Sequence, residues 1–436
     1  MPSASEEVLF VNFNQDATSL AVGTRKGYRL YSLVNSEDLQ LAHEAVVEDA
    51  CVIERLFSSS LVTLVSLTAP RKLRVCHFQK GTEICSHSYA NTILSVRLNR
   101  LRVVVCLEES LFVHNIRDMK VLHTIRDTPP NPNGLADLTA ADISYLAYPG
   151  SSNIGEVQIF DAANLQAVAM IAAHDSPLAA LKFNADGSKL ATASEKGTVI
   201  RVFAIPAGEK LFEFRRGVKR CVTINSLAFD NDSLFLCASS NTETVHVFKL
   251  DPHQTHSDKD SLKPSSDDET TGKGGAAGWI DYVSKTAATY LPAQMTDIFQ
   301  QDRAFATAKL PHFGSRTVLA LNAVKHALRL LVASADGYLY IYNVDKANGG
   351  ECALVKQHKL VVPTKPGAGE VSVEGGGQSA SSGKTYAGAV QLNSANCAEL
   401  LPEHHLEQAV ASASDTAAGL RLDDSREFPP MSHMAD

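Results

Sequence analysis

The sequence predicts an all-β protein: a seven-bladed β-propeller of degenerate WD40-like repeats, followed by a disordered C-terminal tail. A unit of two β-prone runs joined by a tight turn occurs seven times along the 436 residues. The copies are spaced by about 35 to 47 residues, which is typical of four-stranded propeller blades. The pattern stops near His358, where Gly- and Ser-rich sequence begins.

The seven copies occupy residues 13–33, 60–78, 98–116, 144–162, 183–205, 229–250 and 329–344. In each copy the two runs flank a turn, which is the signature of a β-hairpin. One blade cannot bury both faces of its sheet, so the blades must stack and close into a ring. A sandwich or barrel is the alternative, and the spacing favours the propeller. The only tryptophan is Trp279, so the Trp-Asp dipeptide of strict WD repeats is absent.

An insertion at residues 251–301, in the sixth blade, explains why the gap before the last copy is about twice as long as the others. Its first part, residues 251–278, is rich in Asp, Ser, Lys and Gly and predicts a disordered linker. Its second part has apolar side chains near helical spacing, at Trp279, Ile280, Val283, Ala287 and Leu291. Two interpretations remain open on periodicity alone: a helix packed on the propeller flank, or an amphipathic segment that enters a membrane interface.

The predicted domains are therefore a propeller at residues 8–358 and a disordered acidic tail at residues 359–436. We see no secretory signal and no apolar run that could span a membrane. The eight cysteines are scattered without a Cys-x-x-Cys pair, which favours buried free thiols in a reducing, cytoplasmic compartment. A net charge of -8 argues against nucleic-acid binding by the protein as a whole. No spacing suggests a metal, a cofactor or an enzyme active site.

The most distinctive stretch is Phe214-Arg215-Arg216-Gly217, with Lys219 and Arg220 close behind. Neighbouring side chains on extended backbone point to opposite sides, so the two arginines are expected to serve two different anion pockets. A solvated basic turn is the alternative.

Groups that bind phosphate gather on both sides of this stretch. Before it lie His174, Ser194, Lys196, Gly197, Thr198 and Arg201, and after it lie Thr223, Ser226, Ser239, Ser240, Thr242, Thr244 and His246. For any single Ser or Thr a local hydrogen bond is the better interpretation. The joint pattern favours a phosphate site.

Between two such blades, Phe214-Arg215-Arg216-Gly217 resembles the hallmark of the PROPPIN family, β-propellers that bind polyphosphoinositides. The resemblance covers roughly residues 8 to 358. Residues 54–60, 192–203, 239–245 and 302–307 resemble the animal branch of that family, the WD-repeat proteins interacting with phosphoinositides. Residues 114–132 and 171–181 are most similar to one member of this branch.

The resemblance implies a monomeric effector of phosphatidylinositol 3-phosphate and phosphatidylinositol 3,5-bisphosphate that acts in autophagosome formation. It would be cytoplasmic and peripheral on preautophagosomal, endoplasmic-reticulum-associated and endosomal membranes. The first lipid pocket would use His174, Ser194, Thr198, Arg201 and Arg215, lined by Thr192 and Gly197. The second would use Arg216, Ser240, Thr244 and His246, with Gly217 allowing the turn. The insertion would be a membrane-inserting loop that uses Trp279, Ile280, Val283 and Leu291.

A second basic pair, Arg100 and Arg117, lies in the third repeat. From the residues alone this is an ordinary solvated blade surface. The resemblance implies instead a groove for an acidic segment of autophagy-related protein 16, which would recruit the lipidation machinery. Two other functions are the alternatives: a protein-interaction scaffold without lipid binding, and a propeller hydrolase. The second would need an acid/base or metal cluster, for which the sequence offers no candidate.

Overall fold

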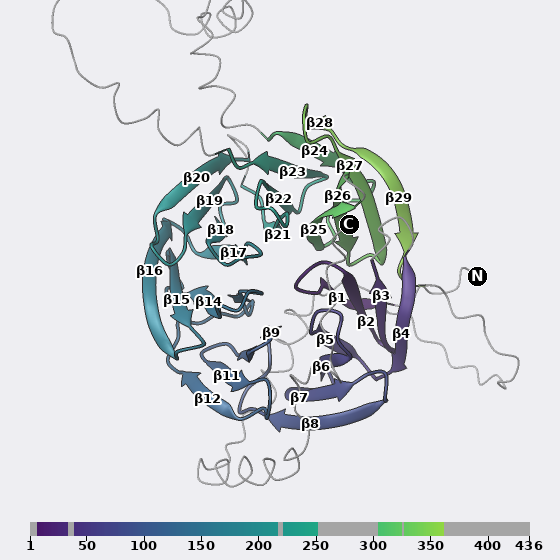
Figure 1. Ribbon diagram of the computed structural model, residues 1–436, viewed down its shortest axis with the longest axis vertical. Coiled ribbons are helices and arrows are strands. Elements are labelled where there is room, and N and C mark those ends of the chain that lie inside the picture. The colour runs from purple at the N-terminus through teal and green to yellow at the C-terminus, as the bar shows by residue number, and fades with distance from the viewer. Residues whose placement is uncertain (1–6, 34–38, 217–220, 252–303, 325–326, 362–436) are drawn as a thin grey trace, which may run out of the picture.

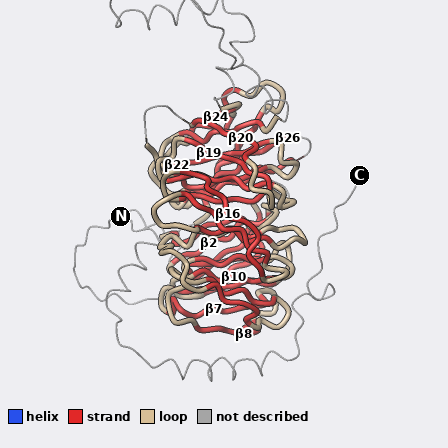
Figure 2. The backbone as a smooth tube through the Cα atoms, turned by 90° about the vertical axis from the view of Figure 1, so that its left-hand side faces the viewer, coloured by secondary structure: helices blue, strands red, loops and turns tan. Residues whose placement is uncertain are grey.

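The computed structural model describes residues 7–33, 39–216, 221–251, 304–324 and 327–361. These residues form seven antiparallel sheets around a common axis, as Figure 1 shows in the view along that axis. Seen from the side in Figure 2, the ring is built from strands and loops, and the described residues contain no helix. The predicted seven-bladed β-propeller is confirmed.

Each of the first four blades is a four-stranded sheet. The first contains β1 (Val8–Phe13), β2 (Ser19–Thr24), β3 (Gly27–Ser32) and β4 (Gln40–Val46). The second contains β5 (Ala50–Arg55), β6 (Leu61–Ser66), β7 (Ala69–His77) and β8 (Thr82–Ser88). The third contains β9 (Ser95–Leu98), β10 (Arg102–Cys106), β11 (Leu111–Asn115) and β12 (Val121–Ile125). The fourth contains β13 (Asp137–Leu138), β14 (Tyr145–Pro149), β15 (Gly155–Asp161) and β16 (Gln166–His174).

The last three blades include the one sheet with a fifth strand. The fifth blade contains β17 (Leu178–Phe183), β18 (Lys189–Ser194), β19 (Val199–Ala204) and β20 (Lys210–Arg215). The sixth contains β21 (Ile224–Phe229), β22 (Phe235–Ser240), β23 (Thr244–Lys249) and β24 (Ala306–Lys309), to which β28 (Gly350–Glu351) adds in parallel. The seventh contains β25 (Thr317–Val324), β26 (Ala327–Ser334), β27 (Tyr338–Val344) and β29 (Ala353–Lys359).

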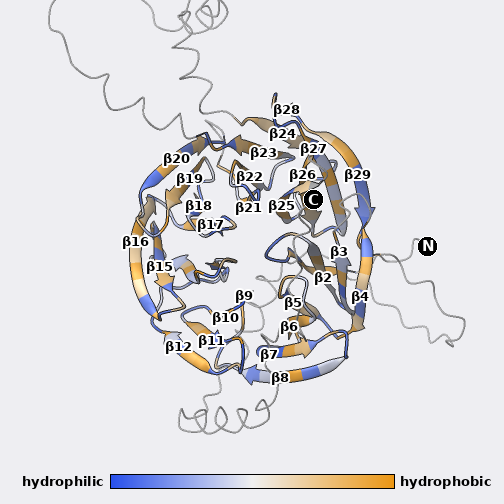
Figure 3. Ribbon diagram, in the orientation of Figure 1, coloured by the Kyte–Doolittle hydropathy of each residue, from blue (hydrophilic) through white to orange (hydrophobic). Residues whose placement is uncertain are grey.

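The hydrophobic core lies between neighbouring blades. One cluster packs strands of the fifth and sixth blades through Ile200, Phe214, Leu227 and Phe248. Inner strands such as β2 are buried along their whole length, whereas the outer strand β4 is largely exposed. Figure 3 shows hydrophilic and hydrophobic segments along the outer strands. Burial of both faces of the middle strands explains their nearly continuous apolar sequence.

The strand order places two kinds of connection on opposite faces of the ring. Within an antiparallel blade, the turn from the second to the third strand lies on the same face as the connection to the next blade. We call this the connection face. The turns from the first to the second strand and from the third to the fourth lie on the opposite face. Residues that are far apart in the sequence can thus be assigned to one face.

In the part of the chain that the structure describes, no strand is exchanged between the first and seventh blades, and packing joins them. Val11 and Leu20 of the first blade share a core cluster with Leu360 and Val361, which follow β29. The hydroxyl of Tyr31 donates a hydrogen bond to the carbonyl of Leu360. Leu360 and Val361 are buried, although they lie beyond the boundary expected at residue 358.

The expected insertion lies between β23 and β24, and residues 252–303 are outside the described residues. The four predicted membrane-inserting residues, Trp279, Ile280, Val283 and Leu291, belong to this segment. Residues 362–436, nearly all of the expected tail, are also outside the described residues. In the part of the chain that is described, no helix has the length and apolarity to cross a bilayer.

Candidate phosphate-binding site

The arginine pair lies at the end of β20, where the chain passes from the fifth to the sixth blade. Phe214 is buried and its ring stacks on Phe248 of the sixth blade, with 4.8 Å between centroids. Arg215 is exposed and Arg216 is half-buried. The amide of Arg216 donates a 2.9 Å hydrogen bond to the carbonyl of Thr198, which fixes the pair against the β18–β19 turn. Both arginines therefore lie on the connection face.

The side chain of Arg216 turns toward the sixth blade. Its Nη2 donates to Ser240 Oγ at 2.7 Å and to Thr242 Oγ1. Its Nε is buried and has no hydrogen-bond partner among the described residues. A buried donor left without a partner is costly, so the guanidinium retains capacity for an anionic ligand. The sequence places Thr242 among the residues that can bind phosphate, but it does not assign Thr242 to the second pocket. The contact with Arg216 adds Thr242 to that set.

The remaining residues of the second predicted set lie next to Arg216 in the sixth blade. Ser240 is the last residue of β22 and is buried, and Thr244 is the first residue of β23. His246 follows on β23. Burial, and then the positive charge of Arg216, lower the pKa of His246 to about 4. This imidazole is neutral at pH 7, and it contributes a hydrogen-bonding group rather than a charge.

The first predicted set gathers at the junction of the fourth and fifth blades. His174 ends β16, and its Nε2 lies 2.9 Å from Thr192 Oγ1 on β18. Burial, and then the charge of Arg201, lower the pKa of His174 to about 4. Thr192 is fully buried, and its hydroxyl lies beside the imidazole of His174. Ser194, at the end of β18, is also buried, and Thr198 is half-buried.

Arg201 is held by a carboxylate that the sequence reasoning missed. Its Nε donates to Glu213 Oε2 at 2.9 Å, and its Nη1 donates to the carbonyl of Ala173 at 2.6 Å. Lys210 Nζ donates to the same Glu213 oxygen at 2.9 Å. Burial opposes ionisation of Glu213, but the hydrogen bonds from Lys210 and Arg201 hold its pKa below the ordinary value. Glu213 could be found only from the cross-strand register, which pairs it with Arg201.

Gly197 has the backbone geometry that the turn of the first pocket needs. Its φ is +62°, and an added Cβ would lie 1.8 Å from the carbonyl oxygen of Val222. Its amide donates to the carbonyl of Ser194 at 2.9 Å. Any side chain here would force the blades apart. Gly217, together with Lys219 and Arg220, lies outside the described residues.

Arg100 and Arg117 lie in two turns of the third blade, after β9 and after β11. Both turns are on the opposite face, away from the arginine pair of the fifth blade. Both side chains are exposed. The guanidinium carbon of Arg100 lies 4.4 Å above the ring centroid of Phe57. The two arginines thus share one edge of one blade, which is what a common partner would require.

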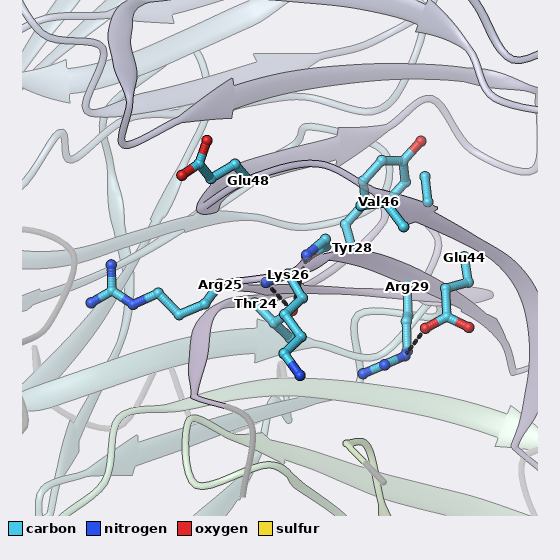
Figure 4. A pocket seen from close by; sticks show the side chains of 10 residues that line it. Thr24, Arg25, Lys26, Tyr28, Arg29, Glu44, Val46 and Glu48 are labelled. Carbon is cyan, nitrogen blue, oxygen red and sulfur yellow. Dashed lines mark hydrogen bonds and ion pairs between the residues drawn. The ribbon is translucent and has the colours of Figure 1, made fainter. Parts of the chain in front are cut away.

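A separate pocket of ≈ 430 Å³ lies on the connection face of the first blade (Figure 4). Arg29 pairs there with Glu44 at 2.8 Å, at the same register positions as Arg201 and Glu213 in the fifth blade. Arg25, which also lines this pocket, is paired with Glu7 and Asp49 at 3.0 Å each. These carboxylates compensate the positive charge, so the pocket suits an anion less well than the predicted sites.

The described residues contain no group of three or more His, Cys, Asp or Glu side chains arranged to hold a metal ion. The seven described cysteines are all free thiols. The chemistry on offer at the arginine pair is recognition of an anion by guanidinium, hydroxyl and imidazole groups.

Comparisons with known proteins show the family to which the chain belongs. The family model described as PROPPIN matches residues 8–361. The chain is 55% identical over 433 residues to WD repeat domain phosphoinositide-interacting protein 2 of Xenopus laevis, covering 98% of this chain and 96% of the relative. It is 48% identical over 438 residues to WD repeat domain phosphoinositide-interacting protein 1 of Homo sapiens, covering 96% of this chain and 92% of the relative. The predicted similarity to one member of the animal branch is confirmed, and that member is protein 2.

More distant relatives and solved structures show the same fold. Autophagy-related protein 18 of Caenorhabditis elegans is 39% identical over 439 residues, covering 98% of this chain and 97% of the relative. A solved complex of KlAtg21 with the coiled coil of AgAtg16 has a TM-score of 0.62 at 24% identity, covering 81% of this chain and 99% of that one. Kluyveromyces lactis Hsv2 has a TM-score of 0.61 at 18% identity, covering 82% of this chain and 100% of that one.

Proposed function

Since the chain belongs to the PROPPIN family, we propose that it binds phosphatidylinositol 3-phosphate and phosphatidylinositol 3,5-bisphosphate on membranes through two pockets on the propeller rim. By this proposal it is a binding protein rather than an enzyme, and it recruits the autophagy lipidation machinery during autophagosome formation. It would act as a monomer from the cytoplasm, at preautophagosomal, endoplasmic-reticulum-associated and endosomal membranes.

One observation carries the proposal: two consecutive arginines at the end of β20 lie between the two sets of phosphate-binding groups, and the guanidinium of Arg216 contacts the second set. Arg216 contacts Ser240 and Thr242 in the sixth blade. Arg215 pairs in the ladder with Val199, beside the β18–β19 turn of the fifth blade. Each set also contains a neutral imidazole, from His174 or His246. Forked guanidinium donors beside hydroxyl groups suit phosphate monoesters on an inositol ring.

Two linked pockets supply the affinity that a basic surface alone would lack. Each basic residue near an anionic membrane contributes about 1 kcal/mol, which is weak and unselective. Two pockets that engage the same membrane act together, and linked sites can exceed single-site affinity by roughly a hundredfold. Arg215 and Arg216 are consecutive residues, so the two pockets stay at a fixed spacing on the rim.

Arg100 and Arg117 are proposed to bind an acidic segment of autophagy-related protein 16. Their exposed guanidinium groups lie in two turns of one blade, on the opposite face from the arginine pair. A structural neighbour of this chain, KlAtg21, was solved in complex with a coiled coil of AgAtg16. Placing the partner groove and the lipid pockets on different faces would let the protein hold both at once.

Vesicle co-flotation tests the lipid proposal. The native chain is expected to float with phosphatidylcholine vesicles that contain phosphatidylinositol 3-phosphate and not with vesicles that lack it. The Arg215→Thr/Arg216→Thr variant is expected to lose flotation while keeping the circular dichroism spectrum of the native chain. The Arg100→Thr/Arg117→Thr variant is the matched control for loss of two positive charges, and it should float as the native chain does.

Two results would overturn the proposal. Flotation of the Arg215→Thr/Arg216→Thr variant at the native level would show that the pair does not bind the lipid. Absence of lipid-dependent flotation by the native chain would favour the alternative of a protein-interaction scaffold.

A further inference from the structure

Phe313 is the only exposed phenylalanine, tyrosine or tryptophan among the described residues, with 71% of its surface accessible. It lies in the connection from β24 of the sixth blade to β25 of the seventh. A single exposed apolar residue needs no explanation by itself. The position of Phe313 relative to the arginine pair is what gives it significance.

The connection that carries Phe313 is the counterpart, one blade further, of the connection that carries the arginine pair. The amide of Arg216 donates to Thr198 O at 2.9 Å, and the amide of Leu310 donates to Glu243 O at 2.7 Å. In the strand ladders Arg215 pairs with Val199, the first residue of β19, and Lys309 pairs with Thr244, the first residue of β23. Lys309 and Leu310 thus occupy in the sixth blade the positions of Arg215 and Arg216 in the fifth.

Both ends of this connection are bonded to the sixth blade, one to the β22–β23 turn and the other to strand β22. Leu310 is held to Glu243, as described, and Thr317 Oγ1 donates to Ser239 Oγ at 2.9 Å. The β22–β23 turn therefore has Arg216 on one flank and the 310–317 connection on the other. Phe313 lies on the connection face, next to the pocket of Arg216.

The residue before Phe313 contacts the seventh blade. The ring of His312 stacks on Tyr338 of the seventh blade, with 6.1 Å between centroids. Tyr340 Oη lies 3.4 Å from His312 Nδ1. Gly314 follows with a φ of +91°, and an added Cβ there would meet nothing within 4 Å. His312 thus packs against the seventh blade, whereas the turn at Gly314 has open space around it.

A positive charge beside Phe313 suits an anionic membrane surface. Lys309, which ends β24, is exposed, and its Nζ lies 3.9 Å from Glu243. Arg316 does not contribute to this surface, because burial, and then the charge of Arg97 in the third blade, lower the pKa of its guanidinium. An aromatic side chain beside a cation is favoured at the boundary between headgroups and acyl chains. We propose that Phe313 enters this boundary layer when the neighbouring pocket holds a phosphoinositide headgroup. This inference rests on the proposed function, and it adds a hydrophobic anchor that is separate from the 251–301 insertion.

Comparison of vesicles with the soluble headgroup tests the inference. The full-length Phe313→Ala variant is expected to bind phosphatidylinositol 3-phosphate vesicles about tenfold more weakly than the native chain, which corresponds to about 1.4 kcal/mol. Its affinity for soluble inositol 1,3-bisphosphate should be unchanged, because Phe313 touches lipid and not the headgroup. Ile143→Ala is the matched control, since Ile143 is 53% exposed in a turn on the opposite face.

Each outcome bears on the Phe313 anchor, on the proposed phosphoinositide binding, or on both. If Phe313→Ala binds vesicles as tightly as the native chain does, the anchor is overturned and the proposed function stays intact. An equal loss toward vesicles and soluble headgroup would also overturn it, because Phe313 would then act through the pocket. If the native chain shows no phosphoinositide-dependent vesicle binding, both fail. If Phe313→Ala loses only binding to a protein, the surface recognises a partner and the lipid inference is wrong.

A second readout follows from the presence of a single tryptophan. Trp279→Phe/Phe313→Trp carries its only tryptophan at the proposed anchor, and Trp279→Phe serves as the blank. Its fluorescence is expected to shift to the blue with phosphoinositide vesicles and to stay unchanged with soluble inositol 1,3-bisphosphate. An unchanged spectrum with vesicles that demonstrably bind the protein would contradict the proposal.

Discussion

His114 shows how a buried imidazole couples stability to pH at the scale of one residue. It is fully buried, with Nε2 2.8 Å from Tyr89 Oη and Nδ1 2.9 Å from Met119 O. Burial lowers its pKa to about 4. Below about pH 6.5 the unfolded chain takes up a proton that the native chain refuses until about pH 4, so acidification through this window favours unfolding.

We therefore expect the free energy of unfolding to fall by up to ~1.4 kcal/mol per pH unit for this residue as pH is lowered from about 6.5 to 4. Glu54 acts in the other direction, because burial raises its pKa to about 6. The quantity to measure is thus the difference between native and His114→Gln chains in urea unfolding at several pH values. The variant should be less stable at pH 7 and lose less on acidification. Parallel pH curves would contradict the expectation.

Glu213 is expected to limit anion binding at the first pocket. It holds Arg201 Nε at 2.9 Å and adds a negative charge beside His174. Partly exposed ion pairs are worth about 0.2–1 kcal/mol, so Glu213→Gln should strengthen headgroup binding by roughly 1.4- to fivefold. Calorimetry with inositol 1,3-bisphosphate in an Arg216→Thr background isolates the first pocket. Weaker binding would mean that Glu213 is needed to orient Arg201.

The residues of the candidate site were predictable by type, but their contacts were not. Two adjacent arginines on extended backbone predict side chains that point in opposite directions. The side chain of the half-buried Arg216 does turn toward the sixth blade. Glu213 was missed because its role depends on pairing with Arg201 across β19 and β20, and that register is absent from local sequence. Thr192 is predicted to line the first pocket, and the structure adds that its buried hydroxyl lies 2.9 Å from His174 Nε2.

At the scale of elements, the turns between strands set the geometry of the candidate site. Two glycines in such turns allow a matched test of how much a close contact matters. Gly197 and Gly81 have φ values of +62° and +63°. A Cβ on Gly197 would collide with Val222 O at 1.8 Å, whereas a Cβ on Gly81 would meet nothing within 4 Å. Gly81→Ala should therefore cost only the backbone strain of about 1–2 kcal/mol.

Gly197→Ala should cost more than Gly81→Ala and should also weaken headgroup binding at the first pocket, because the turn must move. Thermal unfolding of both variants, together with titration by inositol 1,3-bisphosphate, measures the two effects. Equal losses of stability would show that the contact with Val222 relaxes without cost.

The middle strands of each blade were predictable, and the outer strands were not. The seven sequence copies coincide with the second and third strands, such as β18 and β19, whose residues are mostly buried. Apolar runs on both sides of a turn make these hairpins visible in the sequence. Outer strands such as β29 are mostly exposed and carry mixed residues, so their pairing depends on the neighbouring strand and not on their own pattern.

At the scale of the whole molecule, the ring depends on the packing of its last residues against its first blade. Leu360 is 0% and Val361 is 3% exposed, and Leu360 N donates to Gly337 O at 2.8 Å. A chain ending at residue 358 should be a few kcal/mol less stable than one ending at 361, because each side chain contributes about 1.5–3 kcal/mol on burial. Denaturant unfolding compares the two. Equal midpoints would show that the ring closes without them.

The closed ring would hold the two proposed pockets at a fixed spacing. The number of headgroups bound per chain tests the proposal of two pockets most directly. Calorimetric titration with inositol 1,3-bisphosphate is expected to give two per native chain, one for Arg215→Thr, one for Arg216→Thr and none for the double variant. One headgroup per native chain, or loss of both sites in either single variant, would contradict two independent pockets served by adjacent arginines.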